Sequence, residues 1–273
     1  GQEIMKKILD NTLRVLMGIK NVSINYTENN GILMPGLEAE PTVLGNNFNM
    51  NAPGLGFVFG DQRDIRQRAF ENGWLTTSDK LNSAYMKKHT NRLNARATIE
   101  PFRNFRIEIT ANRNFTENYQ TYYRADSLGE FHNYSESEQG SFSMSYLTWN
   151  TAFVSDNRTD YSNENFENFK SYLITIANRL SSNNPNSDYT QRDSLGFPDG
   201  YSMTSQDVMI PAFLAAYGGK KPEKISLDYF PNIPLPNWRL TFNGLTDIDF
   251  IGEYFKNISV NHAYNSTYTI GGF

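Results

Sequence analysis

The stretch IPLPNWRLTFNGL, residues 233–245, contains the pattern that decides the fold. From Trp238 onward apolar and polar residues alternate, which is typical of a strand because successive side chains point to opposite faces. Trp238, Leu240 and Phe242 share one face, and Arg239 lies on the other. The prolines stand just before the run. Proline has no amide hydrogen to donate, and at this position no hydrogen bond between strands is lost. The stretch therefore predicts a two-faced strand that begins at Trp238.

A second pattern occurs three times, at residues 19–27, 102–110 and 255–263: an apolar residue, a basic residue and an asparagine, followed by an alternating run. Asparagine tolerates left-handed backbone angles, so each Lys-Asn or Arg-Asn pair is expected to form a turn before its strand. The unequal spacing of the copies excludes a solenoid of fixed period. The pattern predicts antiparallel hairpins that carry insertions of different lengths.

The elements around these hairpins can also be predicted. A strand that alternates over residues 90–101 precedes the second copy, so the turn between them should be only a few residues long. Apolar residues at helical spacing predict helices over residues 3–17 and within 245–256. Residues 140–154 are strand-like, with an alternation that slips between Tyr146 and Leu147 as at a bulge. We expect this strand to pair with a long strand over residues 105–123.

Two long insertions separate the hairpins, at residues 29–88 and 124–237. The second should contain helices near residues 163–181 and 205–218, the latter with Ser205 and Gly218 as start and stop signals. The glycine-rich GLGFVFG of the first lacks the spacing of a phosphate loop and is expected to be a flexible, partly apolar loop. Short turns on one side and long structured loops on the other are typical of outer-membrane barrels.

The composition excludes several functions. The net charge of −4 and the pI near 5.5 leave no basic stripe for a nucleic acid. There is no cysteine, and the three histidines lie far apart, so no metal site is expected. The carboxylate pairs Asp247 with Asp249 and Glu136 with Glu138 neighbour turn-forming residues and are interpreted as solvated turns rather than acid–base groups. We expect no enzyme, no catalytic residue and no cofactor.

The chain has no run of 18 apolar residues, which excludes a helical membrane span. A barrel strand needs only ~9–11 residues, of which every other one is apolar. If the strands enclose a wet lumen, the inward set is Arg92, Arg96, Arg106, Glu108, Asn112 and Arg239. The set that faces lipid or forms the aromatic girdle is then Leu93, Ile107, Ile109, Trp238, Leu240 and Phe242. The alternative is a soluble sandwich, in which the same apolar face is an ordinary core.

Several segments resemble the SprA/Sov family, the outer-membrane translocon of the type 9 secretion system of Bacteroidetes. The segments that carry the resemblance are NYTENNGILMPG, APGLGFVFG, SQDVMIPAFLAAYGGK, PLPNWRLTFNGL and NHAYNSTYTIGGF. They span most of the chain in the order expected of the C-terminal part of that protein. The resemblance implies that residues 1–273 are a C-terminal fragment of one antiparallel transmembrane β-barrel of about 36 strands, the largest known size. The insertions would then be extracellular loops, and the connections at the other end periplasmic turns.

The resemblance also implies a function and partners. The family exports folded proteins that bear a C-terminal signal domain through the outer membrane, with its loops exposed at the cell surface. Its partners are that cargo, a PorV-type shuttle barrel, a periplasmic plug protein, outer-membrane lipid and the remainder of the same polypeptide. The family has no catalytic residues. The alternative from another class is a soluble or surface-attached β-rich binding or adhesion module.

Overall fold

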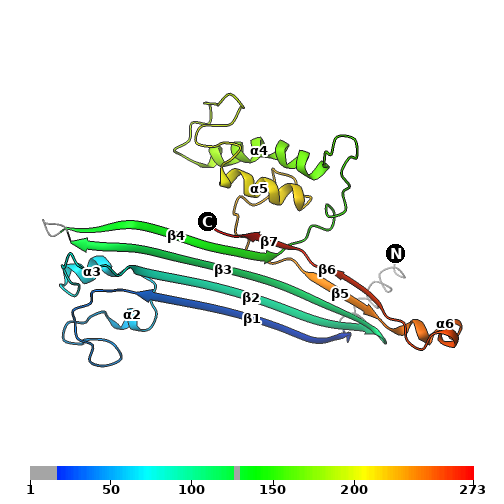
Figure 1. Ribbon diagram of the computed structural model, residues 1–273, viewed down its shortest axis with the longest axis horizontal. Helices are drawn as coiled ribbons and strands as arrows, with labels where there is room; N and C mark the ends of the chain where they lie inside the picture. Colours follow the sequence, from blue (N-terminus) through cyan, green and yellow to red (C-terminus); the bar gives the residue numbers. More distant parts are fainter. Residues whose placement is uncertain (1–16, 126–129) are drawn as a thin grey trace, which may run out of the picture. The chain divides into compact units, whose positions relative to one another are not determined.

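The computed structural model describes residues 17–125 and 130–273 (Figure 1). These residues are mainly β, as expected, and seven strands form one antiparallel sheet in the order β1, β2, β3, β4, β7. Strand β5 also pairs with β3, and β6 pairs with β5. Within the described residues the sheet is open, with β1 at one edge.

The chain divides into two compact units, which we describe separately. Among the described residues, the first contains 17–20, 98–111 and 145–268, and the second contains 21–97, 112–125, 130–144 and 269–273. The helix expected over residues 3–17 falls almost entirely outside the described residues.

A two-residue turn connects β2 (Tyr85–Phe102) to β3 (Phe105–Ala125), so the short hairpin turn is confirmed. Asn104 has a φ of +64°, the left-handed value that asparagine tolerates. At the third copy β5 and β6 pair across a connection that contains the short helix expected there, but the Lys-Asn pairs of the first and third copies do not themselves form a hairpin turn. Asn21 lies inside β1 (Ile19–Leu33), and Asn257 lies in the irregular segment that leads into β6. Of the three copies of the pattern, only the one at Asn104 joins two strands directly, and only this one has its asparagine in the left-handed region.

The first insertion is shorter than residues 29–88, because β1 continues to Leu33 and β2 begins at Tyr85. It contains two short helices, α2 (Leu55–Val58) and α3 (Arg66–Glu71). The GLGFVFG segment, expected to be a flexible loop, forms α2. Residues of the insertion pack on the adjacent ends of β2 and β3 in a small core, which includes Ala39, Ala52, Ala69, Trp74, Leu75, Tyr85 and Tyr123.

Strand β4 (Phe131–Ser145) pairs with β3 from Arg113 opposite Met144 to Ala125 opposite Phe131, so the expected pairing is confirmed. The expected bounds, residues 140–154, are wrong. The strand ends at Ser145, and the next amide, that of Tyr146, donates to the carbonyl oxygen of Ser266 at 3.1 Å. The irregularity lies instead in β3 between Gln120 and Tyr122.

The interpretation of Glu136 and Glu138 as turn residues is also wrong, since both lie within β4. Glu138 stands opposite Tyr119 of β3, and Glu136 accepts a hydrogen bond from the Tyr119 hydroxyl at 3.0 Å. This part of β4 is polar on both faces, so no apolar alternation marks it in the sequence.

Two helices of the second insertion lie side by side (Figure 1). Helix α4 (Glu164–Asn183) starts at Asn163, whose side chain accepts from the Asn165 amide at 2.9 Å. Helix α5 (Gln206–Tyr217) is flanked by Ser205 and Gly218. The Ser205 hydroxyl accepts from the Ser202 amide instead of capping the helix. The apolar positions of both helices face each other and include Leu173, Ile176, Ala177, Val208, Ala212 and Ala215.

The ends of this helical insertion are joined at its base. The Leu235 amide donates to the Ser145 carbonyl oxygen at 3.0 Å, and the Ser145 hydroxyl donates to the Leu235 carbonyl oxygen at 2.6 Å. Residues 146–234 therefore leave and re-enter the strands at one point, which we call the clasp.

After the clasp the chain returns to the sheet as β5 (Asn237–Phe242). A 3-10 helix η1 (Gly244–Asp247) and a short helix α6 (Asp249–Tyr254) then lead to β6 (Val260–Tyr264) and β7 (Thr267–Ile270). The short helix expected within residues 245–256 is thus confirmed. Among the described residues, no helix has the length and hydropathy needed to cross a membrane.

Candidate functional site

Strands β3 and β5 together present two chemically different faces. Directly opposite residues in an antiparallel pair lie on the same face. The register pairs Ile107 with Leu240, and the next pair along, Glu108 with Arg239, lies on the other face. We define the apolar face as Phe105, Ile107, Ile109, Trp238, Leu240 and Phe242, and the polar face as Arg106, Glu108, Arg239 and Thr241.

Aromatic rings stand at both ends of the apolar face. At one end Trp238 stacks on Tyr264 of β6, with ring centroids 4.5 Å apart and planes 23° apart. Trp149 lies beside this pair, 5.4 Å from Trp238 and 5.5 Å from Tyr264. At the other end, next to the β2–β3 turn, the rings of three phenylalanines lie 4.9–6.2 Å apart: Phe102, Phe105 and Phe242. Aliphatic residues occupy the space between the two clusters.

The polar face carries charges of both signs in contact with solvent. Arg106 Nη2 lies 2.8 Å from Glu108 Oε1, and the Arg106 side chain is 53 % exposed. Exposed ion pairs of this kind contribute only about 0–1 kcal/mol to stability. Thr241 Oγ1 donates to Asn261 Oδ1 of β6 at 3.0 Å, which extends the hydrogen-bonding surface across the next strand. The face is therefore hydrated and chemically mixed.

The other predicted residues lie further along β2 and β3. Arg92 and Arg96 of β2 are exposed, and Leu93 between them is partly buried. Asn112 of β3 is exposed. Exposure thus alternates over this part of β2, as the sequence pattern predicts for a strand with two different faces.

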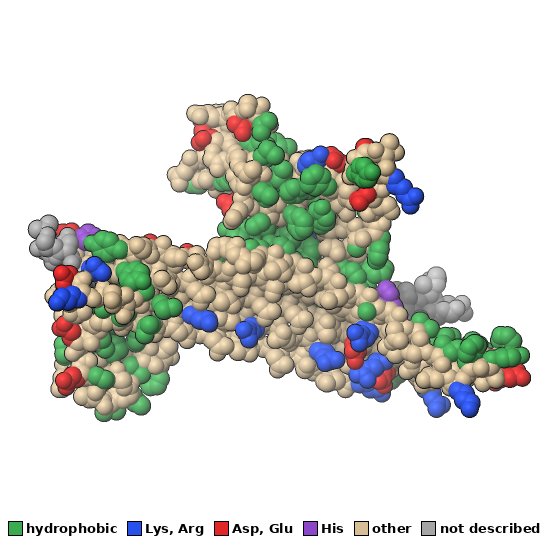
Figure 2. Space-filling view, viewed as in Figure 1, with side chains coloured by type: hydrophobic (Ala, Val, Ile, Leu, Met, Phe, Trp, Pro, Cys, Tyr) green, Lys and Arg blue, Asp and Glu red, His purple; other side chains and the backbone are tan. Residues whose placement is uncertain are grey.

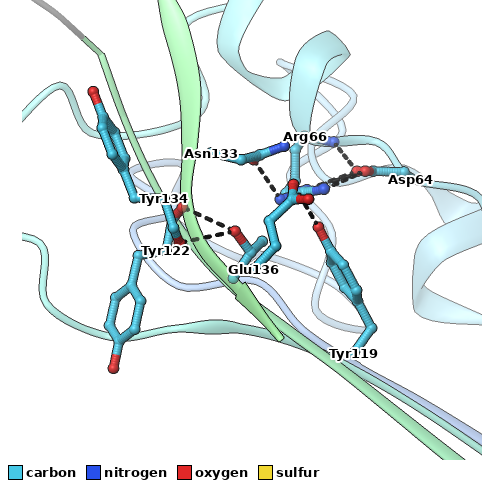
Figure 3. Close-up of polar contacts among 8 residues, drawn as sticks. Asp64, Arg66, Tyr119, Tyr122, Asn133, Tyr134 and Glu136 are labelled. Carbon is cyan, nitrogen blue, oxygen red and sulfur yellow. Dashed lines mark hydrogen bonds and ion pairs between the residues drawn. The ribbon is translucent and has the colours of Figure 1, made fainter. Parts of the chain in front are cut away.

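A separate polar cluster lies in the second unit, where the first insertion meets β2, β3 and β4 (Figure 3). Its centre is Arg66, the first residue of α3, which is only 5 % exposed. Its Nη2 donates to Asp64 Oδ2 at 2.6 Å, and its Nη1 donates to Asn133 Oδ1 of β4 at 2.8 Å. The guanidinium carbon lies 4.2 Å from the centroid of the Tyr85 ring. Arg66 therefore attaches the insertion to two strands at once.

The cluster shifts the pKa values of its members. Burial alone would raise the pKa of Asp64, but the hydrogen bonds from Arg66 outweigh it and hold that pKa below its ordinary value. Burial raises the pKa of Tyr85 to about 12, and it raises the pKa of Tyr123 to about 12 as well. The ion pair and both phenols therefore keep their charge states throughout the neutral range.

A pocket of about 290 Å³ opens beside Arg66. It is lined by residues of the insertion, β2, β3 and β4: Asp64, Arg66, Tyr85, Lys87, His89, Glu117, Tyr119 and Glu138. A hydrogen bond shared with Glu138, followed by burial, raises the pKa of Glu117 above its ordinary value. Glu117 thus holds its proton more tightly than a free glutamate would.

A second pocket, of about 320 Å³, lies in the first unit under α5. It has no charged residue among its lining, which includes Tyr146, Thr151, Asn165, Phe213, Tyr217 and Tyr268. The Tyr146 hydroxyl donates to the Leu214 carbonyl oxygen at 3.1 Å and so holds α5 above the pocket. Hydrophobic side chains also gather on the surface of α4 and α5 (Figure 2), where Phe166 is 47 % and Phe213 is 42 % exposed.

Sequence reasoning missed Arg66 and the pocket beside it. Arg66 stands in the run DQRDIRQRAFENG, which has no apolar alternation, and its partner Asn133 is 67 residues away. The only local signal is Asp64 two positions earlier, which is too common to be diagnostic. In the described part of the chain, no three histidine, aspartate or glutamate residues lie close enough to hold a metal ion.

Comparison with known proteins adds no assignment to this geometry: no family model matches the chain, and no curated protein matches it.

Proposed function

We propose that the chain is a segment of a protein-conducting outer-membrane translocon of the type 9 secretion system. In this proposal residues 92–102 of β2, 105–112 of β3 and 238–242 of β5 cross the membrane as part of one large barrel of about 36 strands. The observation that carries the proposal is the β3–β5 register, which separates an apolar face with aromatic ends from a hydrated face of mixed charge. Outer-membrane strands have this composition, with aromatic girdles at both interfaces.

The open edge of the sheet supports the same proposal. Strand β1 has 15 residues, and its apolar side chains Val22, Ile24 and Tyr26 are 58–67 % exposed. A long edge strand with an apolar face is an aggregation hazard unless another strand pairs with it. In lipid every backbone group must also find a partner. We propose that the remainder of the same polypeptide supplies the neighbouring strands.

The proposed mechanism involves no bond chemistry. A lumen that passes folded proteins must not retain them by hydrophobic contact, and arginines and glutamates on the inner wall keep it hydrated. Arg106, Glu108 and Arg239, with Arg92, Arg96 and Asn112 further along, would form part of this wall. The resemblance of the chain to the SprA/Sov family implies that the cargo carries a C-terminal signal domain and that the partners are a PorV-type barrel and a periplasmic plug.

Four substitutions test which face meets lipid. Arginine at a lipid-facing midplane position costs ~2–4 kcal/mol, whereas a change on the lumen side costs little. We expect Ile107→Arg and Leu240→Arg to reduce the amount of assembled protein in outer-membrane fractions. Arg96→Gln and Arg106→Gln are the matched controls and should assemble normally, with at most altered conductance. If the two Arg→Gln variants do not assemble and the two variants to arginine do, the assignment of the lipid-facing and lumen-facing sides is reversed. If all four variants assemble to the same extent, the barrel proposal is wrong.

A β-rich surface binding module is the second candidate. The exposed aromatic residues of α4 and α5 and the uncharged pocket below α5 favour it, because such surfaces mark interaction sites. Fractionation separates the two candidates. A translocon requires detergent for extraction, and recovery of the native protein as a freely soluble monomer would support the binding module instead.

A further inference from the structure

Helix α6 presents large apolar side chains to solvent. It contains no buried residue. Phe250 is 74 % and Tyr254 is 69 % exposed, and the flanking residues Ile248 and Phe255 are more than half exposed. Hydrophobic side chains visibly gather over this connection between β5 and β6 (Figure 2). Large apolar side chains exposed next to one another in this way mark an interaction surface.

The helix is fixed to the end of the apolar face. Asn104 Nδ2 donates to Asp247 Oδ2 at 2.7 Å, and Asp247 stands two residues before the start of α6. Asn104 belongs to the turn between Phe102 and Phe105, whose rings close the apolar face at this end. Helix α6 therefore begins where the surface proposed to face lipid ends.

The residues of α6 divide into two sides. Phe250 and Tyr254 are four positions apart, and their rings lie 5.6 Å from each other. Asp249 and Glu253 are also four positions apart and occupy the neighbouring side of the helix. The helix thus has an apolar side and a charged side, the general division found in helices that lie in a membrane interface, although the polar face of such helices is usually rich in Lys and Arg rather than acidic.

The backbone of α6 is compatible with that position. The Ile251 amide donates to the Ile248 carbonyl oxygen at 2.9 Å, and the Phe255 amide donates to that of Ile251 at 2.9 Å. The turn thus satisfies part of its own backbone, as a lipid environment demands. Tyrosine, an amphipathic ring with one polar end, is enriched at the level of the lipid head groups.

We propose that α6 lies in the membrane interface at the turn end of the strands, with Phe250 and Tyr254 among the acyl chains and Glu253 in water. The β5–β6 connection then extends the aromatic girdle beyond Phe102, Phe105 and Phe242. This inference rests on the proposed function. It assigns lipid, rather than a periplasmic protein, as the partner of Ile248, Phe250, Tyr254 and Phe255. These residues continue the apolar face, and the only polar side-chain atom among the four is the Tyr254 hydroxyl.

Single labelled cysteines test the inference. The chain has no cysteine, so Phe250→Cys, Glu253→Cys and Leu240→Cys can each carry one environment-sensitive nitrobenzoxadiazole group in an otherwise cysteine-free protein. The native-length protein is reconstituted in vesicles of phosphatidylethanolamine and phosphatidylglycerol that contain lipids with nitroxide on the acyl chain. We expect the labels at 240 and 250 to lose most of their fluorescence to the nitroxide. The label at 253 should instead be quenched by aqueous iodide.

The outcomes separate this inference from the proposed function. If 240 is quenched by nitroxide and 250 only by iodide, the interfacial position is wrong and the barrel proposal stands. If neither 240 nor 250 is quenched by nitroxide, both proposals fail. A label at 250 that is shielded from nitroxide and iodide alike would mean that protein covers α6, and equal nitroxide quenching at 250 and 253 would contradict the two-sided orientation.

Discussion

At the residue scale, Arg66 illustrates how a buried charge is tolerated at the start of a short helix. An isolated buried guanidinium is costly, but Arg66 has Asp64 and Asn133 as hydrogen-bond acceptors and the Tyr85 ring against its face. These partners suit a planar fork of five donors rather than a single ammonium point charge. The geometry therefore selects arginine over lysine at this position.

Arg66→Lys should loosen the first insertion. The variant keeps the positive charge but loses the planar guanidinium that bonds Asp64 and Asn133 at the same time. This loss should lower the stability of the folded insertion by about 1–3 kcal/mol. Because ~1.4 kcal/mol changes an equilibrium tenfold, limited proteolysis within residues 34–84 should accelerate by about tenfold. The matched control is Arg63→Lys, since Arg63 pairs with Asp61 in the same insertion but its side chain is 84 % exposed. Equal protease sensitivity of the two variants would contradict the anchoring role of Arg66.

Glu117 makes stability depend on pH. Its pKa in the folded protein is raised above the ordinary value of 4.5, so the folded state holds this proton more tightly than the unfolded chain. The resulting stabilisation is full below pH 4.5 and is lost as the pH rises through the raised value. Glu117→Gln keeps a donor for Glu138 and removes the second charge. The variant should therefore lose less thermal stability than the native protein between pH 4.5 and pH 8.

The control for this prediction is Glu71→Gln, which removes one charge from the exposed C-terminal end of α3. Thermal unfolding of the detergent-solubilised proteins is measured at each pH. If Glu71→Gln flattens the pH profile as much as Glu117→Gln, the effect reflects net charge and not the shared proton.

At the element scale, α4 depends on one identifiable cap. The Asn163 side chain accepts from the Asn165 amide and also donates to Asp156 Oδ1 at 2.8 Å. Asn163→Ala removes both bonds and should cost about 0.5–2 kcal/mol. Asn163→Ser retains an acceptor for the amide without placing a second carboxylate beside Asp156, and should recover part of that loss. Hydrogen exchange at the first turn of α4 reports the difference, and equal exchange in both variants would show that the cap contributes nothing.

How far the elements could be predicted depends on their patterning. Strand β5 was predictable because Trp238, Leu240 and Phe242 alternate with polar residues, and the helical insertion because α4 and α5 repeat apolar residues at helical spacing. The first half of β4 was not, since its glutamates and serines bear no apolar face and its position depends on pairing with β3. Arg66 was not predictable for a related reason: its site is assembled from distant segments of the chain.

At the scale of the whole molecule, the open sheet limits what the chain can do alone. Among the described residues, strand β1 is an edge strand along 15 residues, and the apolar face of β3 and β5 is only partly buried. Residues 1–273 expressed in isolation should therefore lack a cooperative, monomeric thermal transition in water. Size-exclusion chromatography and calorimetry measure this, with the same chain in detergent for comparison. A monomer that unfolds cooperatively in buffer would favour the soluble binding module.

Because the clasp between Ser145 and Leu235 closes the helical insertion at one point, the insertion could be replaced by another segment without a change in the strands. Its two ends meet through hydrogen bonds of backbone and hydroxyl groups, so few side-chain identities are needed to close it. The cost of loop closure also grows only slowly with length. Related chains could accordingly evolve larger, smaller or quite different surface modules at this point while the strand register beneath stays the same. The clasp is thus a site at which a different surface domain could be inserted while the sheet stays unchanged.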